Sequence, residues 1–296
     1  MASDAFKPLE FQDKELFNEF LRRDPPRISE LTFTNLYMWR HQYHPAWLQR
    51  KDCLLIVYQP KGEAPFGLPP IGAGNKREAL DYLAQYLTKQ TSQVRICRVD
   101  EDFVNAFVDP GEYVCTLDRD NSDYVYLAQD LINLSGRRYH RKKNHLNQFK
   151  KNFRFEYRPL DKELVDHFMQ MQQTWCRMRE CVENPELLVE DFAVHEALSR
   201  FDDLDYRGGA IVINDGVEAF SLGESLNRDT AVIHIEKANP DIPGLYAAIN
   251  QLFCANAWSG MTYINREQDL GSEGLRKAKE SYLPHHMVNK YTVVPK

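Results

Sequence analysis

A run of three short strands joined by two tight turns is the feature of this sequence that most constrains its fold. Apolar side chains alternate with small or polar ones along the predicted strands, at residues 208–214, 217–226 and 230–238. Asp215-Gly216 separates the first two and is typical of a type I′ hairpin, because both central residues of that turn adopt positive φ. Asn227-Arg228 predicts a second turn. The pattern therefore predicts an antiparallel meander.

The elements predicted around the meander alternate between helix and strand. In the C-terminal half, periodic apolar residues predict helices and strands in the order 164–179, 190–201, meander, 245–258, 261–267, 273–282 and 289–294. In the N-terminal half they predict helices at 13–21 and 76–87 and strands at 53–59 and 94–99. This order predicts an α/β (α+β) protein in which each domain has a mixed, mainly antiparallel sheet flanked by helices.

The charge of the chain reverses near its middle. Residues 98–123 contain eight Asp or Glu and two Arg, whereas 137–154 contain eight Lys or Arg and no acid. The basic segment has helical periodicity, with an apolar arc formed by Tyr139, Leu146, Phe149 and Phe153. We place the junction between two domains here. The predicted division is an N-terminal domain (1–135), a basic inter-domain helix (136–158) and a C-terminal domain that carries the active site (159–296).

Composition predicts a cytoplasmic globular protein. The 296 residues carry a net charge of −6, which argues against a protein that coats nucleic acid. No apolar run reaches the length of a transmembrane segment, and the first residues lack the pattern of a signal peptide. The cysteines have no metal-binding spacing, so we expect no metal site and buried, reduced side chains at Cys53, Cys97, Cys115, Cys176, Cys181 and Cys254.

Three segments of the chain resemble one known family. They are SELTFTNLYMWR (29–40), RRYHRKKNHLNQF (137–149) and NREQDLGSEGLRKAKESYLP (265–284). They are similar to a bacterial family of unknown function that is grouped with the C-terminal domain of phosphatidylglycerol lysyltransferase. The resemblance covers most of the chain, and the last segment is its most specific part. It implies two tandem domains of the GNAT acyltransferase fold, similar to the Fem-type aminoacyltransferases.

The resemblance also implies a reaction class. It implies transfer of an acyl or aminoacyl group to an amine or hydroxyl acceptor, with aminoacyl-tRNA or acyl-CoA as co-substrate and no tightly bound cofactor. The acceptor is then a small molecule, a peptide or a lipid headgroup. The sequence shows no membrane-spanning half of a lysyltransferase, which argues against a lipid substrate. The alternative is a non-catalytic protein that keeps the fold to bind a ligand or RNA.

The meander supplies the candidate catalytic residues. A two-residue turn pairs Ser221 with His234 and places Glu236 on the same side of the sheet, beside small residues. Glu236 is then the leading candidate for a general base, with His234 behind it. A slip of one residue exchanges the two faces, and Glu224 takes the place of Glu236. Tyr282 lies where members of the superfamily often place a phenol as general acid.

The loop after the meander and the segment 265–284 supply the candidate donor-binding residues. The loop leads into the N-terminus of a helix, where backbone N–H groups bind anions, and it contributes Asn239, Gly244, Leu245 and Tyr246. It lacks a glycine-rich run, so it matches acyl-CoA poorly and favours another donor. The cluster that follows contributes Arg266, Asp269, Arg276, Lys277 and Lys279. Its alternative role is a solvated helix face with local ion pairs.

The basic segment 137–154 supplies candidate contacts to tRNA. Cationic side chains off its apolar arc can neutralise backbone phosphates, and the candidates are Arg137, Arg138, Arg141 and Lys151. The alternative is an amphipathic helix between domains with a solvated polar face.

Overall fold

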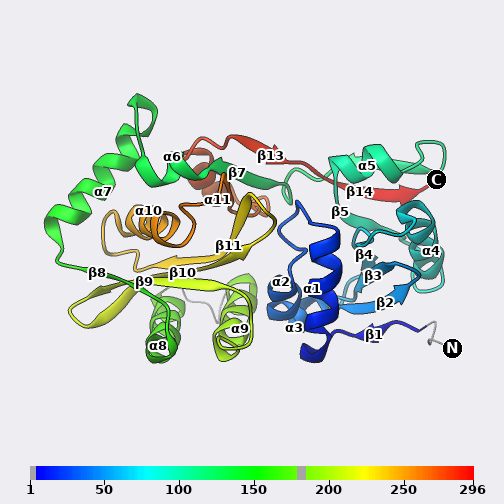
Figure 1. The fold of residues 1–296 in the computed structure, drawn as a ribbon, viewed down its shortest axis with the longest axis horizontal. Coiled ribbons are helices and arrows are strands. Elements are labelled where there is room, and N and C mark those ends of the chain that lie inside the picture. Colours follow the sequence, from blue (N-terminus) through cyan, green and yellow to red (C-terminus); the bar gives the residue numbers. More distant parts are fainter. Residues whose placement is uncertain (1–4, 179–184) are drawn as a thin grey trace. The chain divides into compact units, whose positions relative to one another are not determined.

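The computed structural model describes residues 5–178 and 185–296, and the chain forms two compact units (Figure 1). Unit 1 contains the chain up to Asp123 together with Gln268–Glu273 and Met287–Lys296, and unit 2 contains Tyr124–Glu267 and Gly274–His286. The chain therefore changes unit at Asp123, whereas the sequence places the end of the first domain at residue 135. The basic segment expected between domains lies within unit 2.

Unit 1 is built on a seven-stranded sheet with the order β1-β2-β3-β4-β5-β14-β6. Its strands are β1 (Lys7–Pro8), β2 (Ala46–Arg50), β3 (Cys53–Tyr58), β4 (Phe66–Gly67), β5 (Ile96–Asp100), β6 (Tyr113–Leu117) and β14 (Lys290–Pro295). Its helices are η1 (Phe11–Asp13), α1 (Lys14–Arg23), α2 (Phe33–Met38), α3 (Arg40–Tyr43), α4 (Lys76–Thr88) and α5 (Glu101–Phe107). The Asn75 side chain caps α4, and Leu80, Leu83 and Leu87 of α4 pack in one core with Leu55 and Val57 of β3.

The last strand of the chain belongs to unit 1. The sequence predicts 289–294 as the strand that closes the C-terminal domain, but β14 pairs antiparallel with β5 and β6. Alternation of side chains identifies a strand but says nothing of its partner, so this pairing was beyond the sequence pattern.

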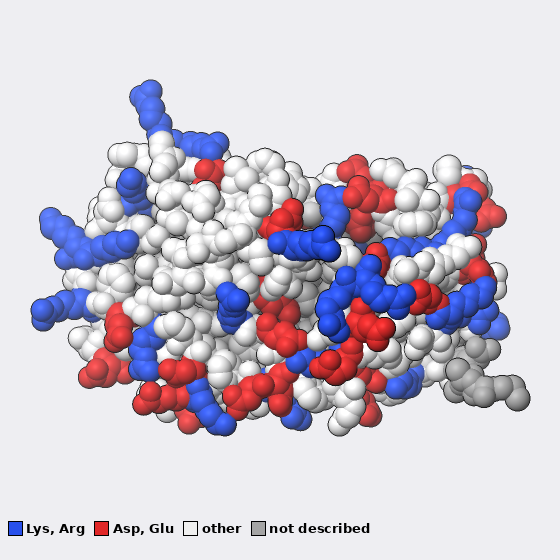
Figure 2. Space-filling view, viewed as in Figure 1, with Lys and Arg blue, Asp and Glu red and all other residues white. Residues whose placement is uncertain are grey.

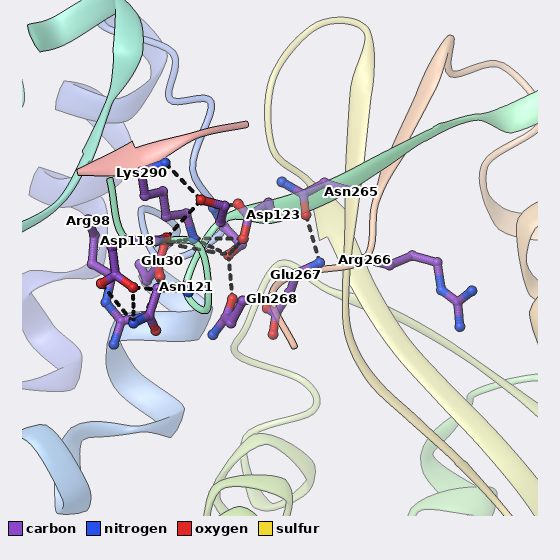
Figure 3. Close-up of polar contacts among 12 residues, drawn as sticks. Glu30, Arg98, Asp118, Asn121, Asp123, Asn265, Arg266, Glu267, Gln268 and Lys290 are labelled. Atoms are coloured by element: carbon purple, nitrogen blue, oxygen red, sulfur yellow. Dashed lines mark hydrogen bonds and ion pairs between the residues drawn. The ribbon is translucent and has the colours of Figure 1, made fainter. Parts of the chain in front are cut away.

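A buried network of charges surrounds the start of β14 (Figure 3). Lys290 is fully buried, and its Nζ lies 2.6 Å from both Glu30 Oε2 and Asp123 Oδ1. Glu30 also pairs with Arg98 at 2.9 Å, and Ser29 donates its N–H and hydroxyl to Asp123 at 2.9 Å. Burial raises the pKa of Glu30, but its two cationic partners outweigh that effect and hold the pKa below its ordinary value. The segment 29–40 thus begins with residues that tie unit 1 together.

Unit 2 is built on a second sheet with the order β13-β7-β12-β11-β10-β9-β8. Its strands are β7 (Asp123–Leu127), β8 (Glu156–Pro159), β9 (Arg207–Ile213), β10 (Gly216–Ser225), β11 (Thr230–Ala238), β12 (Tyr263–Asn265) and β13 (His286–Val288). Its helices are α6 (Ala128–Asn133), η2 (Arg137–Tyr139), α7 (His140–Asn152), α8 (Lys162–Met178), α9 (Pro185–Ser199), α10 (Leu245–Ala257) and α11 (Glu273–Glu280). Among the strand pairs that involve β8 to β12, β11 and β12 are parallel and the others are antiparallel.

Helices cover both faces of the meander of β9, β10 and β11. Figure 1 shows α8 and α9 on one side of these strands and α10 on the other. Phe168 of α8 packs on Phe220 of β10, with ring centroids 4.7 Å apart. On the opposite face Ser221 is fully buried, and Phe253 of α10 lies close to Gly223. The face with small residues is therefore a second packed face, and not the open one that the sequence predicts.

The register of β10 and β11 differs from the predicted one by two residues, and Ser221 pairs with Glu236 instead of His234. The turn accounts for one residue of this difference, because it closes between Leu226 and Thr230 and so holds three residues. The other comes from a β-bulge between Leu222 and Gly223. A Cβ on Gly223 would lie 2.5 Å from the carbonyl oxygen of Val232, so the close approach of the strands there requires glycine.

Candidate functional site

The predicted general base Glu236 lies in a buried ion pair. Arg266, which follows β12, places its Nη2 2.8 Å from Glu236 Oε1, and Asn250 of α10 donates to Glu236 Oε2 at 2.9 Å. Side-chain exposure is 13% for Arg266 and 12% for Glu236. Each carboxylate oxygen of Glu236 thus accepts a hydrogen bond from a neighbouring side chain.

Two tyrosines flank the guanidinium group of Arg266. Its Cζ lies 4.8 Å from the ring centroid of Tyr282 and 5.7 Å from that of Tyr126. The hydroxyl of Tyr126 donates to the carbonyl oxygen of Lys279 at 2.8 Å. Burial raises the pKa of Tyr282, so its phenol stays protonated at neutral pH. The structure therefore brings together Glu236, Arg266 and Tyr282, as the sequence predicts.

Lys142 of α7 reaches the same cluster and was missed as a site residue. Its Nζ lies 3.8 Å from the ring centroid of Tyr282. Partial burial and repulsion by Arg266 lower the pKa of Lys142 to about 8, against a smaller opposite effect of Glu236. A signal was present in the sequence: Lys142 lies three residues after Tyr139 and four before Leu146, which places it on the apolar arc.

His234 lies between two carboxylates. Its Nδ1 is 2.7 Å from Glu267 Oε1, and its Nε2 is 2.8 Å from Glu224 Oε1. Burial lowers the pKa of His234, but hydrogen bonds and charge interactions with both carboxylates outweigh it and raise the pKa to about 10. The ring is then an imidazolium that donates from both nitrogens. The bulge in β10 makes this possible, because it turns Glu224 to the face of His234 and Glu236, where the sequence offers Glu224 and Glu236 as alternatives.

The segment around Arg266 is held in an uncommon backbone conformation. Glu267 has a φ of 57°, in the left-handed region. Asn265 accepts a hydrogen bond from the Glu267 N–H at 2.8 Å (Figure 3), and the Lys279 ammonium donates to the Arg266 carbonyl oxygen. With His234 bound to the Glu267 side chain, these contacts fix the direction in which Arg266 points. Lys279 thus contacts the backbone of the Arg266 segment, and its contact with the donor stays a prediction.

The other residues of the predicted donor-binding cluster have different contacts and exposure from Arg266. Asp269 belongs to unit 1, is fully buried, accepts from the Gly271 N–H at 2.9 Å and pairs with Arg119 at 3.2 Å. Lys277 is exposed and Arg276 half-buried on α11. Asp269 therefore stabilises the turn before α11, and its contact with a donor stays a prediction.

The first turn of α10 packs closely against α7. Gly244 precedes this helix with a φ of 84°, and a Cβ there would lie 2.4 Å from the carbonyl oxygen of His145. Leu245 is fully buried, whereas Tyr246 is 40% exposed and its hydroxyl accepts from Trp175 Nε1 at 3.3 Å. Asn239 donates to Glu218 at 2.8 Å. Asn239 and Tyr246 thus point toward α8, and the turn at Gly244 is shaped by packing against α7.

A cavity of about 420 Å³ lies on the α8 side of the meander. It is lined by His167, Gln170, Met171, Thr174, Trp175, Asp215, Gly216, Val217, Glu218 and Asn239. This cavity contains the predicted donor residue Asn239 but not Glu236, which lies on the opposite face of the strands.

The candidate tRNA contacts lie on exposed positions of η2 and α7. Arg137, Arg138, Arg141 and Lys151 are exposed, while Tyr139, Leu146 and Phe149 are buried. Figure 2 shows Lys and Arg side chains projecting at the edge where Figure 1 draws α7. Arg138 forms an ion pair with Asp130 of α6 at 2.8 Å. Three of the four residues of the predicted apolar arc are thus buried, whereas Phe153 follows the end of α7 and is half-buried. Contact with tRNA stays a prediction.

Two cysteines depart from the expected buried, reduced state. Cys115 is exposed, and Cys176 takes part in a disulfide bond. Cys181 lies outside the described residues. Spacing rules screen for metal ligands and do not detect a disulfide or an exposed strand position. Within residues 5–178 and 185–296, no group of three or more His, Cys, Asp or Glu side chains is arranged to hold a metal ion.

Comparison with known proteins shows the family of this chain. Residues 22–294 match the family described as phosphatidylglycerol lysyltransferase, C-terminal. The chain belongs to this family. This confirms the resemblance that the three segments indicate. The lysyltransferase C-terminal family match includes both the Arg266 segment and α7. None of the helices in the described part of the chain combines the length and apolar character needed to span a membrane.

Members and neighbours of the family share the fold over nearly the whole chain. A conserved protein of unknown function from Bacteroides thetaiotaomicron is 30% identical, with 100% of both chains covered and a TM-score of 0.92. The C-terminal domain of a putative lysylphosphatidylglycerol synthetase from Agrobacterium fabrum is 11% identical over 96% of this chain and 91% of its own, with a TM-score of 0.68. FemX is 9% identical over 97% and 96%, with a TM-score of 0.61.

The solved structures with this fold include a tandem GNAT protein, so the predicted mixed α/β fold of two tandem GNAT-like domains is confirmed. The chain spans 56% of the length of a curated relative that it matches, an uncharacterised protein of Mycoplasmoides gallisepticum with 25% identity over 178 residues, or 58% of this chain.

Proposed function

We propose that unit 2 transfers an aminoacyl or acyl group to an amine or hydroxyl acceptor, with Arg266 at the reacting centre. The proposal rests on an N–H group of Arg266 that is available to donate a hydrogen bond. Arg266 Nη1 is buried and has no hydrogen-bond partner within the described residues, while Nη2 is held by Glu236. A fixed cationic donor in a site of low exposure stabilises the oxyanion that forms when an acyl carbon is attacked.

The residues around Arg266 take distinct roles in this proposal. Glu236 holds the guanidinium group and is itself held by a hydrogen bond from Asn250. Tyr282 keeps its phenol proton and can donate it to the leaving oxygen, which suits a general acid. His234 fixes Glu267 and so the backbone from which Arg266 extends. The family of lysyltransferase and Fem-like folds supports aminoacyl transfer as the reaction class.

Aminoacyl-tRNA is the donor that we favour over acyl-CoA. The first turn of α10, where the superfamily holds pyrophosphate, packs against the α7 backbone at Gly244 and has no glycine-rich loop. The exposed side chains of Arg137, Arg138, Arg141 and Lys151 offer contacts to an RNA backbone. The acceptor class stays open between a small molecule, a peptide and a lipid headgroup, and we expect the reaction in the cytoplasm.

The proposal is tested by incubating the protein with mixed charged tRNAs or mixed acyl-CoAs, together with pooled amine and hydroxyl acceptors. Mass spectrometry then detects deacylated donor and acylated acceptor. We expect transfer from charged tRNA that falls by about 100-fold or more in Arg266→Gln, because one oxyanion donor contributes that much. An exposed arginine outside the proposed site and tRNA contacts, Arg228→Gln, is the control for a general charge effect. Equal rates in wild type and Arg266→Gln would remove Arg266 from the reacting centre.

A non-catalytic binding protein is the second candidate. The cavity beside Trp175 and Glu218 is the observation that favours it, because it lies on the face away from Arg266. A thermal shift produced by a ligand that is recovered unchanged, with no transfer from any donor, would support this reading over the first.

A further inference from the structure

Lys142 differs from every other cation of its segment. Lys142 is half-buried, whereas the remaining Lys and Arg side chains of 137–154, all of them described, are exposed. Its Nζ lies 3.8 Å from the ring centroid of Tyr282. No carboxylate or carbonyl group in the described parts of the chain pairs with this Nζ. A partly buried ammonium group held only by an aromatic face is poorly compensated for the water that it has lost.

The charges that face Lys142 work against its ammonium form. Arg266, which follows β12, repels it, and so does Arg141 on its own helix, while Glu236 of β11 attracts it and Tyr282 stays neutral. Glu236 is already neutralised by Arg266 at 2.8 Å. Burial and repulsion together lower the pKa of Lys142 to about 8, so a useful fraction of the amine is neutral near physiological pH.

We infer that Lys142 is the base that removes the proton from the acceptor amine at the Arg266 site, an inference that rests on the proposed function. A neutral lysine amine poised close to the working pH is suited to general base catalysis. Both oxygens of Glu236 already accept hydrogen bonds from Arg266 and Asn250, and His234 has both nitrogens engaged. Lys142 is the remaining titratable amine that contacts the cluster through Tyr282.

The proton steps balance within the cluster. The acceptor nitrogen attacks the ester carbon of the donor, a C–N bond forms, and the carbonyl electron pair moves to an oxyanion beside Arg266. Lys142 takes the proton from the attacking nitrogen. The ester C–O bond then breaks, and the phenol proton of Tyr282 goes to the leaving oxygen. The Lys142 ammonium returns a proton to the phenolate, which restores both groups.

The test compares Lys142→Gln and Lys142→Arg with Lys143→Gln, an exposed neighbour, in the transfer assay as a function of pH. We expect the rate of wild type to rise with a midpoint near pH 8, and both Lys142 variants to lose that rise and about 100-fold or more of the rate. Arginine retains the charge but cannot act as a base, so it should fail as glutamine does. Rescue by Lys142→Arg would show an electrostatic role and overturn the inference.

A second measurement uses the wild-type protein and requires no variant. Trace acetylation with acetic anhydride over a range of pH, read by mass spectrometry, reports the titration of each lysine. We expect Lys142 to become reactive at a lower pH than Lys143, and equal titration of the two would overturn the inference. In the assay, transfer that survives in Lys142→Gln contradicts the inference alone. Absence of transfer by wild type contradicts the proposed function and the inference with it.

Discussion

At the scale of single residues, Glu236 is a structural partner of Arg266 as much as a candidate base. Glu236→Gln leaves Arg266 buried without a counter-charge, so we expect a loss of about 3 kcal/mol in the free energy of unfolding together with a loss of transfer. Chemical denaturation followed by fluorescence measures the first quantity. Glu218→Gln is the matched control, because Glu218 accepts from Asn239 but has no arginine partner in the structure. Equal stability of the two variants would show that the ion pair contributes little.

His234 predicts a dependence of stability on pH. Its pKa is about 10 in the folded protein against 6.5 for the ordinary group, so the folded state binds the proton more tightly. The stabilisation is therefore complete below about pH 6.5 and is lost as the pH rises toward 10. We expect the free energy of unfolding to fall over this range in wild type and to fall less in His234→Gln. Parallel curves for the two proteins, measured by urea denaturation at several pH values, would contradict the assigned role.

The sequence identified some of these residues and missed others for definite reasons. Glu236, Arg266 and Tyr282 were found because strand alternation and the 265–284 motif mark them. Their contacts were not predictable, since the partner Asn250 lies in a helix with no motif of its own. Lys142 was read as one more member of a basic run, although its position on the apolar arc distinguishes it. Its reactivity depends on Arg266, and the two residues come close to each other only in the folded structure.

At the scale of elements, the meander was predicted with its strands and turns but not with its register. Loop length and the bulge each shift the pairing by one residue. Two shifts of one residue preserve the face of Ser221 and Glu236, so the predicted grouping of these two residues holds below the bulge. They also turn Glu224 to that face. Without the bulge, no register would place Ser221, Glu224 and Glu236 together on one face of the sheet. Gly223 was the one sign of a bulge in the sequence.

Helix α7 carries a prediction of its own. Its apolar residues face α10, so replacing Arg137, Arg141 and Lys151 together by Gln should leave folding unchanged, since all three side chains are exposed. If α7 contacts RNA, each lost phosphate contact lowers tRNA affinity and makes its decline with salt less steep. Filter binding at several salt concentrations measures both. No retention of tRNA by wild type up to micromolar protein at low salt would remove nucleic acid from the mechanism.

At the scale of the whole molecule, the chain returns twice to unit 1 after entering unit 2. Composition and the charge reversal predicted two domains, and the family resemblance predicted their fold. Neither shows that the last strand crosses back to pair with β5 and β6, because such pairings depend on contacts between residues far apart in the sequence. The segment 29–40 was found by resemblance, and the structure gives its first residues a physical reason to be there: they bind the strand that returns.

Lys290 is the residue through which that return can be tested. It is fully buried between Glu30 and Asp123, which lie far apart in the Met1–Asp123 segment of unit 1. Lys290→Met leaves an excess of buried carboxylate, so we expect a loss of about 3–5 kcal/mol in the free energy of unfolding. Adding Asp123→Asn removes one of the two carboxylates that lost Lys290 and should recover part of that loss, which double-mutant analysis of denaturation curves measures. Lys296→Met, at the exposed end of the chain, controls for the loss of a charge. Strictly additive effects of Lys290→Met and Asp123→Asn would show that the two side chains do not stabilise unit 1 through each other.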